Sequence, residues 1–199
     1  VDIAGIRRML TQDRQSAWIA LATTIAVVVI GVLPGILIGM AFSIAILLAD
    51  IARPHDALLG HRPGSTALHD VGDDEQAEGI PGLVVYRFYG PLIFANVGLF
   101  IERLQRFIDQ QQVPVRQVVI DAGAMPSIDL TAVEKLRPVL QKLIDQGIEV
   151  AVARAPLPLR ELKLASELDD LLPEEKSFPQ VSDAVAAYLA RKSRTGGEE

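Results

Sequence analysis

The stretch Val118–Gly147, VVIDAGAMPSIDLTAVEKLRPVLQKLIDQG, decides the fold of this chain. It opens on a β-branched run that ends at Asp121 and predicts a short buried strand. After a loop of small residues, apolar side chains return at helical spacing, at Val133, Leu136, Leu140, Leu143 and Ile144. The unit is therefore strand, tight loop and helix, and in a parallel sheet such a junction is where a functional site belongs.

The start of this helix carries recognisable signals. Thr131 and Glu134 form a capping-box pattern, and Asp129 adds negative charge near the positive end of the helix dipole. Pro138 lies two turns further on, where it removes a backbone donor and predicts a bend. Gly147 predicts the C-terminal end of the helix.

Strands and amphipathic helices alternate on both sides of this unit. The pattern predicts a short edge strand at 66–70, further strands at 83–88, 92–94, 149–153 and 176–178, and helices at 97–108, 158–168 and 181–189. This order predicts an α/β domain over residues 81–195, with a mostly parallel sheet covered by helices.

The N-terminal part has a different composition. Residues 17–49 hold no charged side chain over 33 positions, which predicts membrane insertion. One helix of this length would span about 50 Å, against roughly 30 Å of hydrocarbon. Pro34 and Gly35 interrupt the run and arginines flank both ends, so we expect a hairpin turning at Pro34-Gly35 with both ends in the cytoplasm. One tilted, kinked helix and a buried hairpin in a soluble core are the alternatives.

The chain thus divides into terminal transmembrane helices (1–55), a linker (56–80) and the α/β domain (81–195). A short amphipathic helix is expected around residues 3–10. Four arginines against three aspartates give residues 1–55 a charge of +1. Because the whole chain has a net charge of −6, the remainder carries −7. An acidic domain argues against nucleic acid as a partner. The chain begins at Val1, and we expect it to be the C-terminal piece of a longer protein.

Few residues suggest chemistry. The chain has no cysteine, and His55, His61 and His69 lack the spacing of a helical ligand pair, so we expect solvated linker histidines and no metal site. Asp121 ends a strand, but a second carboxylate that could share a Mg²⁺ ion is not evident. Phosphate-binding glycine motifs and a nucleophile–base pair are lacking. We therefore expect no catalytic residue, no cofactor and no enzyme activity.

Three features together resemble the C-terminal end of SulP-type anion transporters. They are Leu33-Pro34-Gly35 within the apolar run, the exit Arg53-Pro54, and a domain containing Phe94-Ala-Asn96 and Ile128-Asp-Leu-Thr-Ala132. In that family the last membrane helices lead into a cytoplasmic STAS domain. The resemblance implies a membrane α-helical hairpin followed by an α/β STAS domain with four to five strands, in a multi-pass protein of the bacterial inner membrane.

The resemblance also implies a regulatory loop. Soluble bacterial antagonists with this domain carry a phosphorylated serine in an Asp-Ser-Ser-Gly loop. The matching residues are Asp129 to Ala132, so Thr131 falls at the phosphoacceptor position, and Ser127 and Asp129 belong to the same candidate loop. Leucine replaces the first serine and alanine the glycine. A purely structural role for Asp129 and Thr131, capping the helix, is the alternative.

Phe94 and Asn96 lie at a turn into a helix. They are either a buried aromatic and an N-cap, or a contact surface for the membrane part of the same transporter.

The function implied is that of a C-terminal fragment of a secondary anion transporter, for sulfate, bicarbonate or dicarboxylate-like anions. Its STAS domain would regulate transport or mediate protein interaction. The alternative is a membrane-anchored signalling module, similar to an anti-sigma-factor antagonist, switched by phosphorylation at Thr131. The partners implied are the lipid bilayer, the remaining transmembrane helices of the same protein, a protein or nucleotide at the STAS domain, and a second copy in a homodimer.

Overall fold

The structure, a computed structural model, describes residues 14–65, 67–165 and 168–195. The chain forms two compact units that divide after Ala52, and each is described by itself. The amphipathic helix expected around residues 3–10 lies outside the described residues.

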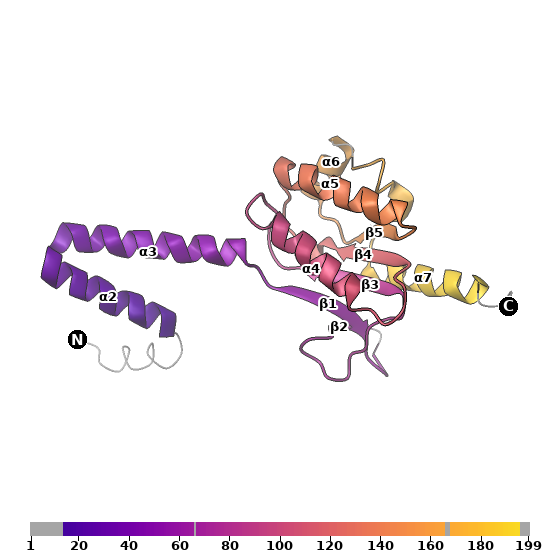
Figure 1. Cartoon of the computed structure of the whole chain (residues 1–199), viewed down its shortest axis with the longest axis horizontal. Coiled ribbons are helices and arrows are strands. Elements are labelled where there is room, and N and C mark those ends of the chain that lie inside the picture. Colours follow the sequence, from indigo (N-terminus) through magenta and orange to yellow (C-terminus); the bar gives the residue numbers. More distant parts are fainter. Residues whose placement is uncertain (1–13, 66, 166–167, 196–199) are drawn as a thin grey trace. The chain divides into compact units, whose positions relative to one another are not determined.

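The first unit is a pair of helices, α2 (Arg14–Ile30) and α3 (Val32–Ala52) (Figure 1). With 21 residues, α3 is about 31 Å long, which matches the hydrocarbon thickness of a bilayer. It is also apolar enough to cross a membrane. The chain reverses at Gly31, whose φ of 110° favours glycine, and not at the expected Pro34-Gly35. Pro34 lies instead in the first turn of α3, where its missing N–H leaves no helical hydrogen bond unmade.

The two helices pack through small residues. A Cβ atom at Gly35 would lie 2.7 Å from the backbone of Val27, and one at Gly39 would lie 2.9 Å from the Thr23 methyl group. Small residues four apart allow helix backbones to approach closely, as they do in membranes. Large apolar side chains elsewhere on the pair are exposed, among them Val28 and Leu33. Such a surface suits hydrocarbon better than water.

The second unit is built on a six-stranded sheet in the order β2-β1-β3-β4-β5-β6. The last four strands are parallel, and the first two run antiparallel to their neighbours. The α/β class with a mostly parallel sheet is therefore confirmed. The strands are β1 (Asp56–His61), β2 (Leu68–Asp70), β3 (Leu83–Phe88), β4 (Gln117–Asp121), β5 (Glu149–Ala153) and β6 (Ser177–Phe178).

The stretch assigned to a linker, 56–80, holds β1 and β2 and belongs to the sheet. The expected edge strand is β2, but β1 was not predicted at all, and it pairs with β3 next to the centre of the sheet. Gly60 is a close-approach residue there, because a Cβ atom would collide with the carbonyl group of Glu78. Only three residues, 53–55, separate the end of α3 from the start of β1.

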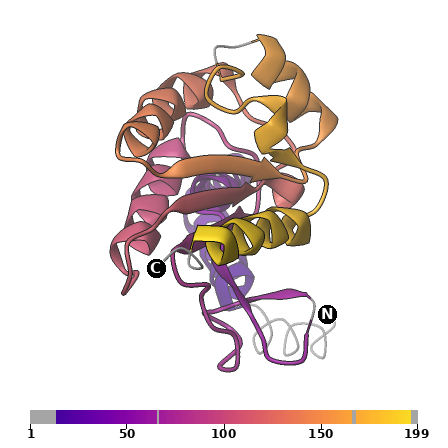
Figure 2. The same ribbon diagram turned by 90° about the vertical axis from the view of Figure 1, so that its right-hand side faces the viewer.

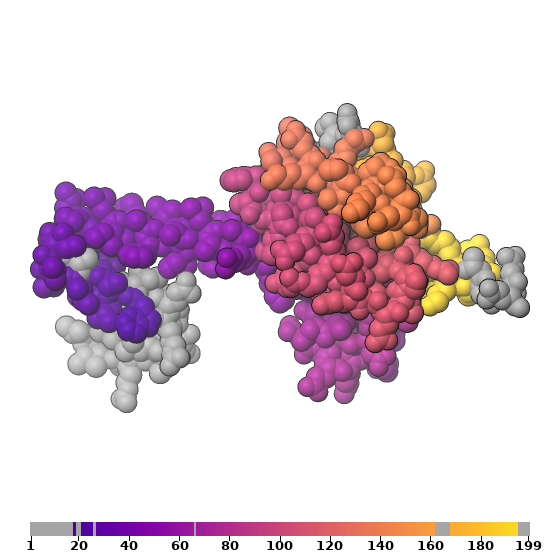
Figure 3. All heavy atoms as spheres, in the orientation of Figure 1, coloured from indigo at the N-terminus to yellow at the C-terminus, as the bar shows by residue number. Residues whose placement is uncertain are grey.

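Helices cover both faces of the sheet (Figure 2). One face packs against α4 (Val97–Asp109), α5 (Leu130–Asp145) and α6 (Leu157–Ala165), and the other against α7 (Val181–Thr195). Short 3-10 turns, η1 (Ala122–Ala124) and η2 (Glu174–Lys176), follow β4 and precede β6. In the space-filling view, α4 and α5 lie side by side over the face turned to the viewer (Figure 3).

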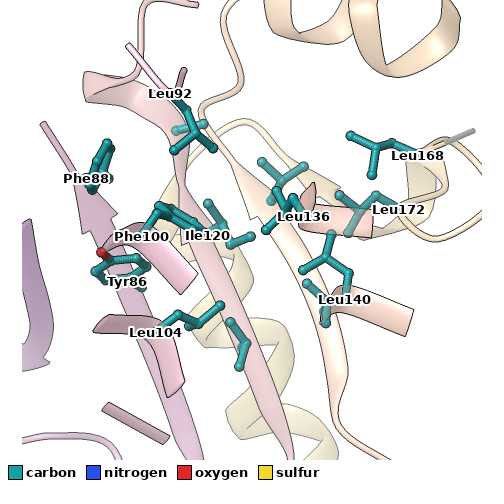
Figure 4. Close-up of a cluster of buried hydrophobic side chains, with 14 of the residues drawn as sticks. Tyr86, Phe88, Leu92, Phe100, Leu104, Ile120, Leu136, Leu140, Leu168 and Leu172 are labelled. Carbon is teal, nitrogen blue, oxygen red and sulfur yellow. The ribbon is translucent and has the colours of Figure 1, made fainter. Parts of the chain in front are cut away.

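Aromatic rings fill the core between the sheet and α4 (Figure 4). The Phe100 ring lies 4.9 Å from that of Tyr86 and 5.3 Å from that of Phe88, centroid to centroid. All three side chains are fully buried. The Tyr86 hydroxyl donates a 3.3 Å hydrogen bond to Asp56, the first residue of β1, so the core also fastens the strand that follows α3.

Two smaller expectations are settled by the backbone. Residues 92–94 do not form a strand, because Asn96 and Val97 both bond the Ile93 carbonyl and the chain turns into α4. What remains of strand pairing there is a single bridge between Leu92 and Ile128. Helix α5 runs without interruption through Pro138.

Candidate functional site

The loop before α5 is organised by Asp129. Its Oδ1 atom accepts a 2.6 Å hydrogen bond from the Ala132 amide, which makes Asp129 the N-cap of α5. Its Oδ2 atom accepts a second bond, of 2.9 Å, from the Phe94 amide. The predicted capping box placed Thr131 at the N-cap, and this is wrong. Asp129 is the N-cap, and Thr131 is the second residue inside the helix.

Thr131 is exposed, as is Ser127 at the other end of the loop. Among the described residues, none hydrogen-bonds the Thr131 hydroxyl. An exposed hydroxyl in the first turn of a helix lies where the helix dipole favours an added negative charge.

The loop before α5 pairs with the loop that follows β3. The Leu92 amide donates to the Ser127 carbonyl at 2.9 Å, and the Asp129 amide donates to the Leu92 carbonyl at 3.0 Å. A further bond joins the Gly90 amide to the Ala124 carbonyl at 3.0 Å. The fold thus brings together two groups of candidate residues that lie more than thirty positions apart in the sequence.

Asn96 occupies the N-cap position of α4, but its side chain makes no capping bond. It is fully buried and points back into the preceding turn instead. Its Oδ1 atom accepts from the Ile93 amide and its Nδ2 atom donates to the Pro91 carbonyl, both at 2.9 Å. Asn96 therefore fixes the shape of the loop that carries Phe94.

Phe94 is 65% exposed, so the expectation of a buried aromatic is wrong. Leu130, the first residue of α5, is 59% exposed. Because the Phe94 amide bonds Asp129, these two apolar side chains flank the capped end of α5 together with Thr131. We call Phe94, Leu130 and Thr131 the α5 surface.

A second group of side chains lies at the carboxyl ends of three parallel strands. Asp121 ends β4 with its side chain fully buried, between Arg87 of β3 and Arg154 just after β5. Arg154 donates to both carboxylate oxygens, at 2.8 and 2.7 Å, and Arg87 donates to Oδ2 at 2.6 Å. The Gly123 amide adds a 3.1 Å bond. We call Arg87, Asp121 and Arg154 the Asp121 cluster.

The protonation of this cluster follows from its contacts. Burial by itself would raise the pKa of Asp121, but the hydrogen bonds from Arg154, Arg87 and Gly123 outweigh burial, so the pKa lies below the ordinary value. Both carboxylate oxygens are taken by guanidinium groups. Asp121 is therefore a structural anion and not a free metal ligand.

Sequence reasoning identified Asp121 but missed both arginines. Arg87 lies 34 positions before Asp121 and Arg154 lies 33 positions after it, so only the parallel pairing of β3, β4 and β5 brings them together. A usable signal existed, because polar residues at the ends of successive parallel strands share one edge of the sheet.

The histidines lie in or directly beside the first two strands of the sheet. His55 precedes β1, His61 ends it and His69 lies in β2. Donor atoms of His55, Asp70 and Asp73 lie within 4.8 Å of one another on the surface. Exposed groups of this kind are common without a metal, and the absence of a metal site stays a prediction.

A cavity of about 270 Å³ lies between the sheet, α5 and α6. Its inner wall is apolar, with Ile120, Met125, Leu136 and Val152. Arg160 and Ser177 also line the cavity, so it has one cation at its wall, and nucleotide binding stays a prediction.

The STAS domain family matches residues 75–184. A probable sulfate transporter of Mycobacterium tuberculosis is 39% identical over 191 residues, which are 96% of this chain and 34% of that protein. High affinity sulfate transporter 2 of Stylosanthes hamata is 28% identical over 163 residues, covering 77% of this chain and 24% of that protein. The chain thus spans about a third or less of the length of these curated relatives.

Solved structures show the same fold. The murine anion transporter Slc26a9, in its inward-facing state, matches 92% of this chain and 30% of its own with a TM-score of 0.79 at 16% identity. The STAS domain of a SulP transporter from Vibrio cholerae matches 60% of this chain and 90% of its own, with a TM-score of 0.51 at 20% identity.

Fold and site together define an α/β domain that follows a pair of apolar helices and has two polar groups at one edge of its sheet. The chain belongs to the STAS domain family. Its resemblance to the C-terminal part of SulP-type anion transporters is confirmed by the sulfate transporters among its relatives.

Proposed function

We propose that this chain is the C-terminal part of a secondary anion transporter whose STAS domain regulates transport. The observation that carries the proposal is the joining, within three residues, of a membrane-length apolar helix to a STAS domain. A relative named as a probable sulfate transporter that aligns over 96% of the chain supports it. Sulfate, bicarbonate and dicarboxylates are the candidate substrates.

In this proposal α2 and α3 are the last two membrane helices, and both their outer ends lie in the cytoplasm. The arginines on either side of the apolar run support this orientation. The STAS domain is then cytoplasmic, and in a bacterium the membrane is the inner membrane. The exposed apolar side chains of the helix pair face lipid and the remaining transmembrane helices, and the whole protein forms a homodimer.

The α5 surface is the proposed point of regulation. Thr131 is exposed at the start of a helix, and a phosphate there would gain from the helix dipole. Asp129 opposes that phosphate, whereas Asp121 does so weakly because two guanidiniums neutralise it. Phe94 and Leu130 offer apolar area beside Thr131 for the membrane part of the transporter, or for a partner protein.

The second candidate function is a membrane-anchored signalling module, in which a kinase or partner protein reads Thr131. The exposure of the Thr131 hydroxyl favours it. The two proposals differ in whether the full-length protein moves anions.

Uptake of labelled sulfate by cells expressing the full-length protein tests the first proposal, with bicarbonate and dicarboxylates as competitors. Transport predicts saturable uptake that one of these anions inhibits. Uptake equal to that of cells without the protein, for every anion tried, would leave only the signalling module.

The regulatory role is tested by Thr131→Glu, with Ser182→Glu as the matched control. Ser182 is likewise exposed and is the second residue of α7, on the opposite face of the sheet. We expect Thr131→Glu to change the uptake rate at least twofold, and Thr131→Ser and Ser182→Glu to leave it unchanged. If Thr131→Glu and Thr131→Ser both behave as the wild type, the threonine has no regulatory role.

A further inference from the structure

The Asp121 cluster holds more positive than negative charge. Arg87 and Arg154 place N–H groups at 2.6 and 2.7 Å from the same oxygen of Asp121. Among the described residues, neither guanidinium pairs with a second carboxylate. Two cations held this close repel one another, and one carboxylate neutralises only one of them. The cluster therefore carries a surplus charge of about +1 within a domain that is acidic as a whole.

The buried carboxylate also fixes the direction of both guanidiniums. Asp121 is fully enclosed, whereas the Arg87 and Arg154 side chains are 22% and 35% exposed. A guanidinium has five N–H groups, and Asp121 takes two from Arg154 and one from Arg87. Groups directed away from the carboxylate therefore reach the surface with little freedom left to lose on binding.

Tyr89 extends the same surface. Its hydroxyl oxygen accepts a 3.3 Å hydrogen bond from Nη1 of Arg87, and the guanidinium carbon lies 5.8 Å from the ring centroid. Because the oxygen accepts this bond, its own hydrogen is free to point to a ligand. The Tyr89 side chain is exposed.

The backbone around Arg154 is strained. Arg154 has a φ of 55°, the one positive value at a non-glycine residue in the described chain. Its guanidinium packs on Gly123, where a Cβ atom would lie 2.6 Å from Nε. The left-handed backbone conformation costs free energy at a non-glycine residue, and the position of the Arg154 side chain also requires glycine at 123. Backbone strain of this kind is found most often at functional sites. The carboxyl edge of parallel strands is also where α/β sheets bind ligands.

We infer that Arg87, Arg154 and Tyr89 form a binding site for a tetrahedral oxyanion, sulfate or phosphate. The two guanidiniums donate N–H groups to different oxygens of the anion, and the Tyr89 hydroxyl donates to a third. Asp121 lies behind them and orients both cations without touching the ligand. The site is part of the STAS domain and does not depend on whether the whole protein transports anions.

Equilibrium dialysis of the full 199-residue chain in detergent tests this site, with radiolabelled sulfate as the probe. Ionic strength is held constant with sodium chloride, and unlabelled phosphate is the competitor. We expect one sulfate per chain, displaced by millimolar phosphate but not by the same increment of chloride. Displacement by phosphate at a lower concentration than unlabelled sulfate would identify phosphate as the preferred ligand.

Three variants locate the binding. Arg154→Lys keeps the charge but loses the forked donors, and we expect at least a tenfold weaker affinity. Tyr89→Phe removes one donor from an exposed side chain and should weaken binding about fivefold without unfolding the domain. Arg191→Lys is the control, because Arg191 pairs with Glu149 at the other end of the strands. It should bind as the wild type does.

Circular dichroism establishes that each variant is folded. Should Arg154→Lys fail to fold, Tyr89→Phe and Arg87→Lys decide the matter. Absence of saturable sulfate and phosphate binding by the wild-type chain would overturn the inference. So would unchanged affinity in Tyr89→Phe together with the folded arginine variants.

Discussion

At the scale of single residues, the two aspartates at this edge of the sheet do different work. Asp121 is a buried anion that holds two strands' arginines in place, whereas Asp129 is a half-buried cap that joins two loops. The sequence pattern marks both of them by position, one at the end of a strand and one before a helix. It does not reveal Arg87, Arg154 or Phe94, the partners that lie more than thirty residues away.

Replacing Asp121 by asparagine should destabilise the domain strongly. Asp121→Asn leaves two guanidiniums beside a neutral amide, and we expect a loss of about 3–5 kcal/mol in the free energy of unfolding at pH 7. Urea unfolding of the chain in detergent, followed by circular dichroism, measures this loss. Asp109→Asn, at the exposed end of α4, is the control and should change the free energy of unfolding by less than about 0.5 kcal/mol.

The stability difference between the wild type and Asp121→Asn should depend on pH. Because the pKa of Asp121 is lower in the folded than in the unfolded chain, its contribution to stability is complete above the unfolded pKa of about 4. That contribution disappears as the pH falls through the lowered, folded-state pKa. The wild type should therefore approach the stability of Asp121→Asn below about pH 4. A constant difference between pH 7 and pH 3 would contradict the ion-pair account.

Asp129→Ala should remove the cap of α5 and the bond to Phe94 together. We expect the free energy of unfolding to fall by about 1–2 kcal/mol, and hydrogen exchange at the Phe94 amide to become faster. Asp129→Asn keeps an acceptor oxygen for the Ala132 amide and should lose less. Unchanged exchange at Phe94 in Asp129→Ala would show that the two loops are held by other contacts.

At the scale of elements, the prediction succeeded where a segment carries its own signal. The strand ending at Asp121 and the helix ending near Gly147 were located to within a residue or two, because their apolar spacing is regular. Strand β1 was missed because Gly60 and the nearby prolines suggest a loop, although Ala57 and Leu59 alternate inward as in a strand. Glycine is required at position 60 because the Glu78 backbone lies against it. That contact cannot be read from the sequence around Gly60.

The packing of α2 on α3 can be tested by a disulfide. A Cβ atom at Gly39 would lie 3.6 Å from the Cβ atom of Thr23, within the range that a disulfide requires. The chain has no cysteine of its own, so the double variant Thr23→Cys, Gly39→Cys should cross-link in membranes under mild oxidation. The cross-link is detected as loss of maleimide labelling at both cysteines, which returns after reduction. Thr23→Cys with Ile44→Cys, an exposed position on α3, should not cross-link.

At the scale of the whole molecule, the proposed topology, with both ends of the helix pair in the cytoplasm, can be tested by labelling. Single cysteines at Gln15, Leu33 and His61 mark the start of α2, the turn and the end of β1. In inside-out vesicles, a maleimide that does not cross membranes should label the first and third but not Leu33→Cys. Right-side-out vesicles should give the reverse. Labelling of Gln15→Cys and His61→Cys from opposite sides would mean that the run crosses the bilayer once.

The three residues between Ala52 and Asp56 form a short connection between α3 and the STAS domain. Even fully extended, they separate those two Cα atoms by no more than about 14 Å, and Pro54 limits their freedom further. If α3 spans the bilayer as proposed, this connection keeps the STAS domain close to the membrane surface. Under that proposal a ligand or partner of the domain would be bound near the bilayer surface, and a change in the tilt of α3 would be transmitted directly to β1.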